Sequence, residues 1–78
     1  MEPITIIIQA LKIEAKMKPD ARIYVGTTTY TYREFADMLD QYPGVNNHFV
    51  KTFLSSAVNL YNSNNAFKRR MISLAKEG

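Results

Sequence analysis

The chain has 78 residues, a formal net charge of +3, no cysteine and one histidine. This composition excludes disulfides and a histidine-rich zinc site, so packing or self-association must stabilise a core that is marginal at this length. We therefore expect one small domain over residues 1–78 that holds no metal and no other cofactor.

The first predicted element is a helix over about residues 3–17. Pro3 suits the first turn of a helix, and apolar side chains then recur at helical spacing in two stripes. The stripes are Ile4, Ile7, Ile8, Leu11, Ala15 and Ile6, Ala10, Ile13, Met17. A helix that is apolar on two sides is usually buried on both. The β-branched run at residues 4–8 leaves a strand open as an alternative.

Two β-rich runs follow and predict a short hairpin. Arg22–Val25 and Thr29–Thr31 flank a turn that contains Gly26. Because two strands alone are barely stable in water, we expect this hairpin to lie against helices.

A second helix is predicted over about residues 32–41. Thr31 and Glu34 have the spacing of a capping box, in which each side chain binds the backbone N–H of the other residue. The run Tyr42-Pro43-Gly44 is a turn signal and ends the helix.

The last segment predicts one long helix over about residues 47–76. Asn46 or Asn47 can cap its start. From Val50 onward apolar positions alternate three and four residues apart, with no change of phase across residues 62–65. Asparagine and serine are poor helix formers, so a bend near Asn64, or a new helix capped by Ser63 or Asn65, stays open. The predicted fold class is α+β, mainly α.

A continuous last helix also predicts a homodimer. About 30 residues of helix span about 45 Å, and the second half would expose its apolar side chains unless another chain covers them. A single asparagine in an apolar heptad seam is a known dimer device. The predicted interface is Phe53, Leu60, Asn64, Phe67, Met71 and Leu74. Because any amphipathic helix shows this spacing, a parallel coiled coil does not follow.

The charge of the chain is segregated. Residues 1–46 carry five basic and six acidic side chains, net −1, whereas residues 47–78 carry five basic side chains and only Glu77, net +4. Such asymmetry is typical of proteins that bind a polyanion, although a basic face can also simply be solvated. The leading hypothesis is a small regulatory protein that binds nucleic acid. Its predicted contacts are Asn47, His48, Lys51, Lys68, Arg69, Arg70 and Lys76.

Two further features bear on this hypothesis. A helix at 32–41, a turn and a helix from 47 have the outline of a helix-turn-helix, although the turn is longer than the tight form. In that arrangement Asn46, Asn47, His48, Lys51 and Thr52 would face a major groove. Because no acidic side chain precedes Glu77 in the last helix, Lys68, Arg69 and Arg70 are expected to be free to meet phosphates.

The alternative hypothesis is a protein-binding inhibitor or adaptor, of the size that phages and mobile elements encode. Its contact surface would be the tyrosine-rich hairpin, with Tyr24, Tyr30 and Tyr32, or the acidic side of the second helix. Tyrosine is also simply a favoured strand residue. A third reading is a pure assembly subunit held by the first and last helices.

Enzymatic chemistry is not expected. Gly26 and Gly44 stand alone, so there is no glycine-rich phosphate loop. His48 lies about two helical turns from Ser55 and Ser56, too far to activate either. The acidic residues Glu34, Asp37 and Asp40 are spaced as on the solvated side of a helix. We expect no small-molecule substrate, no targeting segment, no membrane partner and a cytoplasmic location.

Overall fold

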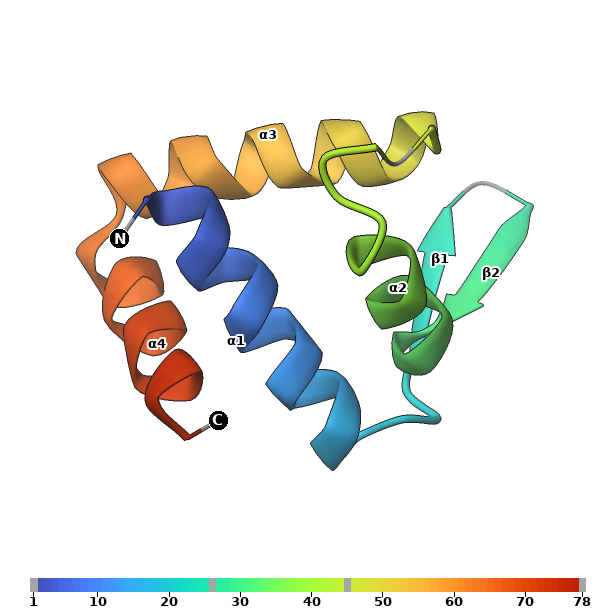
Figure 1. Ribbon diagram of the computed structural model, residues 1–78, viewed down its shortest axis with the longest axis horizontal. Helices are drawn as coiled ribbons and strands as arrows, with labels where there is room; N and C mark the ends of the chain where they lie inside the picture. Colours follow the sequence, from blue (N-terminus) through green and yellow to red (C-terminus); the bar gives the residue numbers. More distant parts are fainter. Residues whose placement is uncertain (1, 26, 45, 78) are drawn as a thin grey trace.

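The computed structural model describes residues 2–25, 27–44 and 46–77, and these contain four helices and one antiparallel hairpin (Figure 1). The elements are α1 (Pro3–Met17), β1 (Arg22–Val25), β2 (Thr28–Thr31), α2 (Tyr32–Leu39), α3 (His48–Ser63) and α4 (Asn65–Lys76). The predicted fold class, α+β and mainly α with these elements in this order, is confirmed.

Helix α1 is the central element of the fold, and the strand alternative for its isoleucine run is wrong. Pro3 occupies its first turn, where a missing N–H costs nothing. Its buried side chains are Ile7, Ala10, Ile13 and Ala15. It packs against α2, α3 and α4, and Figure 1 shows it running between α4 on one side and α2 on the other. The two apolar stripes are therefore covered from two sides, as their spacing predicts, except at Met17, which is 56% exposed.

The hairpin and α2 form one unit beside the start of α3. The strands pair with Arg22 opposite Thr31 and Tyr24 opposite Thr29; the turn residue Gly26 lies outside the described residues. The predicted capping box is confirmed, since the Thr31 N–H donates to Glu34 Oε1 at 2.8 Å and the Glu34 N–H donates to Thr31 Oγ1 at 3.1 Å. Helix α2 ends at Leu39, slightly earlier than predicted.

Aromatic rings join this unit to α3. The ring of Tyr30 from β2 stacks on Phe49 at a centroid distance of 5.8 Å. The buried ring of Phe35 from α2 meets Phe53 edge to face at 4.9 Å. Such pairs are typical of aromatic cores, and they supply the helix contact that a two-stranded hairpin needs.

The prediction of one helix over residues 47–76 is wrong, because the chain leaves helical geometry at Asn64, with φ −130° and ψ 110°. The Asn64 N–H donates to the Leu60 carbonyl at 2.8 Å and closes α3, while Asn64 Oδ1 accepts from the Phe67 N–H at 2.9 Å and caps α4. An asparagine side chain stabilises this break because it satisfies a backbone donor that a helix start leaves unpaired. The capping residue is thus Asn64 itself, between the two candidates Ser63 and Asn65.

The break lets α4 fold back onto α1 and cover the apolar side chains that a straight helix would expose. Met71 is only 3% exposed, and Phe67 and Leu74 are half-buried against the core. In α3 the buried positions are Val50, Leu54, Ala57 and Tyr61, whereas Leu60 is 43% exposed. The predicted apolar spacing therefore faces the core only in part, since Val50, Ala57 and Met71 are buried whereas Leu60 and Asn64 are exposed.

Candidate nucleic-acid interface

Three predicted contacts lie at the start of α3. Asn47 caps this helix: its Oδ1 accepts from the Val50 N–H at 3.1 Å, and its Nδ2 donates to the Tyr30 hydroxyl at 3.3 Å. Both ends of this amide are therefore engaged within the chain. His48 and Lys51 are exposed in the first turn of α3.

The helix-turn-helix outline is only partly present. Residues 40–47 separate α2 from α3, so the connection is much longer than the tight turn of that motif. Because Asn47 is used as a cap, it cannot at the same time read a base through its amide. Asn46, Lys51 and Thr52 remain exposed.

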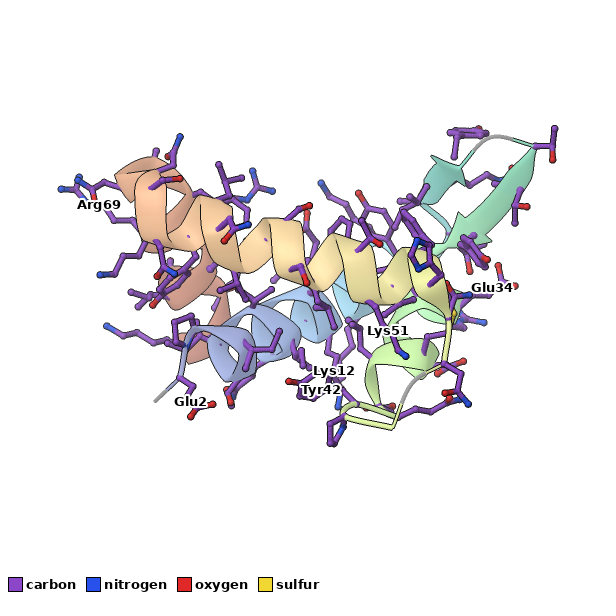
Figure 2. All side chains as sticks on the ribbon, turned by 90° about the horizontal axis from the view of Figure 1, so that it is seen from above. Glu2, Lys12, Glu34, Tyr42, Lys51 and Arg69 are labelled. Atoms are coloured by element: carbon purple, nitrogen blue, oxygen red, sulfur yellow. The ribbon has the colours of Figure 1, made fainter. Side chains whose placement is uncertain are left out.

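The basic triplet lies in the first turns of α4, next to the break. Arg69 is exposed, and Figure 2 shows it at one end of the molecule. Lys68 is also exposed, with its Nζ 5.6 Å from the centroid of the Tyr61 ring, a cation–π distance. Arg70 differs, because its guanidinium donates to Glu14 Oε1 of α1 at 3.2 Å. The expectation that all three charges are free is therefore wrong for Arg70.

A corner with a high density of amide and basic side chains results. We define the α3–α4 corner as the exposed residues Asn62, Asn64, Asn65, Lys68 and Arg69. The sequence contains no carboxylate side chain between Asp40 and Glu77. Among the residues that the structure describes, neither Lys68 nor Arg69 forms a salt bridge.

The predicted contacts fall into two groups. Lys51 of the first group and Asn62 of the corner are 11 residues apart in α3, about 16 Å along the helix. Lys76 is exposed in the last turn of α4, where a positive charge also favours the helix dipole. The structure does not bring all seven residues into one patch.

The predicted dimer interface is largely used within the chain. Phe53 belongs to the aromatic cluster with Phe35, Asn64 is a cap, and Met71 is buried. Phe67 and Leu74 pack against the core as well. Only Leu60 is left as an exposed apolar member of that set.

The three hairpin tyrosines have different surroundings. Tyr30 is held by Phe49 and Asn47, and Tyr32 is half-buried. Tyr24 is 73% exposed. On the acidic side of α2, Glu34 is used in the capping box and Asp40 is paired with Lys12.

Sequence reasoning missed two surface hollows beside the α2–α3 connection, one against α1 and α3 and the other against α1 and the end of α2. The α3 hollow has a volume of about 440 Å³ and is lined by Tyr42 and Lys51 together with apolar side chains such as Ile4, Leu54 and Val58. The α1 hollow, of about 510 Å³, is lined by Tyr42, Lys12 and Lys16 together with Ile8 and Leu39. Tyr42 was interpreted only as part of a turn, and no local pattern shows that the fold places it between two hollows.

Other kinds of site find no support in the described ranges. Nowhere in residues 2–25, 27–44 and 46–77 do three histidine or carboxylate side chains come close enough to hold a metal ion. No helix in those ranges is long and apolar enough to cross a membrane.

Comparison of the chain with protein-family models, with curated proteins and with solved structures finds no match.

Proposed function

We propose that this protein is a small non-enzymatic regulator that binds nucleic acid through its α3–α4 corner. The observation that carries the proposal is the pair of exposed cations Lys68 and Arg69 at the start of α4, which form no salt bridge among the described residues and lie in a stretch of 36 residues (41–76) without a carboxylate side chain. Cations in such a place attract phosphates and release the counterions that surround a nucleic acid.

The amide side chains of the corner add a second capability. Asn62 and Asn65 are exposed beside the two cations. An asparagine amide carries both donors and an acceptor, and it is well suited to the edge of a base. Phosphate contacts would thus come from Lys68 and Arg69, and any preference for base identity would come from the neighbouring amides.

The test is binding of a fluorescently labelled oligonucleotide, followed by anisotropy at low salt. The variant is Lys68→Ala/Arg69→Ala, and the matched control is Lys18→Ala/Arg33→Ala, which removes two exposed charges elsewhere. Both variants have a net charge of +1, that is +3 minus two. The corner variant should bind at least about tenfold more weakly than the control, because two phosphate contacts are lost. Equal affinities of the two variants would contradict the proposal.

A protein-binding role is the second candidate, and it is supported by Tyr24. This side chain is 73% exposed on a hairpin that projects from the helices (Figure 1). Exposed tyrosines are frequent anchors in protein interfaces. If the protein binds no nucleic acid, Tyr24→Ala should weaken binding to the partner recovered with the wild-type protein.

The homodimer and the cytoplasmic location stay predictions. With α4 folded onto α1, Leu60 is the exposed apolar side chain of the predicted interface that still supports self-association. Light scattering over a range of protein concentrations measures the mass directly.

A further inference from the structure

Tyr42 has an unusual position among the exposed aromatic side chains. It lies in the connection between α2 and α3, is 43% exposed, and forms part of the wall of both hollows. Figure 2 shows Tyr42 with Lys12 and Lys51 on one side of the molecule. An aromatic ring therefore stands between two open spaces, each within the range of 300–1,000 Å³ that ligand pockets typically have.

The charge around Tyr42 is positive. Lys51 lines the α3 hollow, and Lys12 and Lys16 line the α1 hollow, one helical turn apart. Among the described residues, Asp40 is the one acidic side chain that lines either hollow, and it is paired with Lys12. Three positive charges and one negative charge give a net charge of +2 around the two hollows. An anionic ligand with flat apolar groups fits this combination.

We propose that the two hollows bind single-stranded nucleic acid, with unpaired bases stacked on Tyr42 and the phosphates close to Lys51 and Lys16. This inference rests on the proposed function and narrows its ligand class. In a duplex the faces of the bases are covered by neighbouring bases, so a tyrosine ring can stack only on bases that are unpaired. A basic groove that carries an aromatic ring is the usual device of proteins that bind single strands.

The α3 hollow also leads towards the α3–α4 corner. Its lining runs along α3 from Lys51 to Asn59, a distance of about 12 Å. Lys68 and Arg69 follow the end of α3 in the chain, in the first turns of α4, so a strand that continued along α3 past Asn59 would run towards the end of the helix after which they come. In this proposal Lys51 contacts the strand at the start of the path, and Lys68 and Arg69 contact it beyond the end of α3.

The experiment compares a labelled oligothymidine of about 12 nucleotides, the matching oligouridine and a duplex of about 20 base pairs. The proteins are wild type, Tyr42→Leu and Tyr42→Phe, with Tyr24→Leu as the control for loss of an exposed tyrosine. Tyr42→Leu should weaken binding of at least one single strand about fivefold or more, whereas Tyr42→Phe and Tyr24→Leu should bind like wild type. Circular dichroism checks that each variant is folded.

A second readout does not depend on a loss of affinity. The sequence contains no tryptophan, so Tyr42→Trp introduces a single reporter into the proposed site. Stacking on a base should quench the tryptophan fluorescence as the single strand is added, and the duplex should quench it much less. This readout also decides the question if Tyr42→Leu does not fold.

The outcomes separate the inference from the proposed function. Suppose that single strands bind to the wild type, that Tyr42→Leu binds them equally well, and that they do not quench Tyr42→Trp. The inference is then overturned, while weaker binding by Lys68→Ala/Arg69→Ala still supports the proposed function. If the duplex binds more tightly than both single strands, the inference also fails. If neither the single strands nor the duplex bind to the folded wild-type protein, both the inference and the proposed function are wrong.

Discussion

At the scale of single residues, identity alone does not decide a role, and the asparagines are the clearest example. Asn47 and Asn64 each accept a hydrogen bond from a backbone N–H and start a helix. Asn62 and Asn65 are exposed and remain available for a ligand. The four side chains are chemically the same, and only the backbone around each one separates a cap from a candidate contact.

The cap at Asn64 gives a direct stability prediction. Asn64→Ala should lower the free energy of unfolding by about 1 kcal/mol, because the Phe67 N–H loses its acceptor. Asn62→Ala is the control and should change the free energy of unfolding by less than about 0.5 kcal/mol. Urea denaturation measures both. A stabilising effect of Asn64→Ala would indicate that a continuous helix is preferred.

The ion pair between Glu14 and Arg70 predicts an effect on binding. Glu14→Gln removes a negative charge and leaves the Arg70 guanidinium free to reach a phosphate. Affinity for an oligonucleotide should rise, and the slope of log K against log salt should become steeper by up to about 1. Since surface ion pairs contribute little to stability, the free energy of unfolding should change by less than about 1 kcal/mol. Unchanged affinity would place Arg70 outside the contact surface.

At the scale of elements, the starts of helices are predictable from the sequence where they depend on residues close together in the chain. Pro3 begins α1, and the Thr31–Glu34 capping box begins α2, because both signals act within a few residues. The break at Asn64 was harder to predict, since its local signal competed with an apolar spacing that suits one helix equally well. The spacing of apolar residues gives no sign of the break, because α4 packs back against α1 and buries apolar side chains there. A contact between segments far apart in the chain is not visible in a local sequence pattern.

The packing of α4 predicts different costs for two apolar side chains. Met71→Ala should lower the free energy of unfolding by roughly 2 to 5 kcal/mol, because Met71 is almost fully buried. Leu60→Ala should cost less than about 1 kcal/mol, since Leu60 is exposed. A larger loss of stability in Leu60→Ala than in Met71→Ala, together with loss of a dimer in Leu60→Ala, would instead support the predicted interface between two chains.

At the scale of the whole molecule, a basic and an acidic side chain mark the two ends of the long axis. The described residues extend over 32 × 23 × 22 Å, and Figure 2 shows Arg69 and Glu34 at opposite ends. Glu34 of α2 thus lies far from Arg69 of the α3–α4 corner. Such a distribution orients the molecule in the field of a polyanion, so that the basic end arrives first.

The candidate site was predictable only in part. The excess of positive charge after residue 46 indicated a polyanion, and the structure shows Lys51, Lys68 and Arg69 exposed. The pairing of Arg70 with Glu14 and the position of Tyr42 between two hollows depend on how α1 lies against α4 and against the α2–α3 connection. Neither arrangement is encoded in a spacing along the chain.

The most direct test of the central claim is the salt dependence of oligonucleotide binding by the wild-type protein. If Lys16, Lys51, Lys68 and Arg69 contact phosphates of a single strand, log K should fall linearly with log salt with a slope of about −2.8, and Lys68→Ala/Arg69→Ala should reduce the slope to about −1.4. Absence of binding by the folded protein at low salt, or binding that does not change with salt, would contradict a nucleic-acid-binding function.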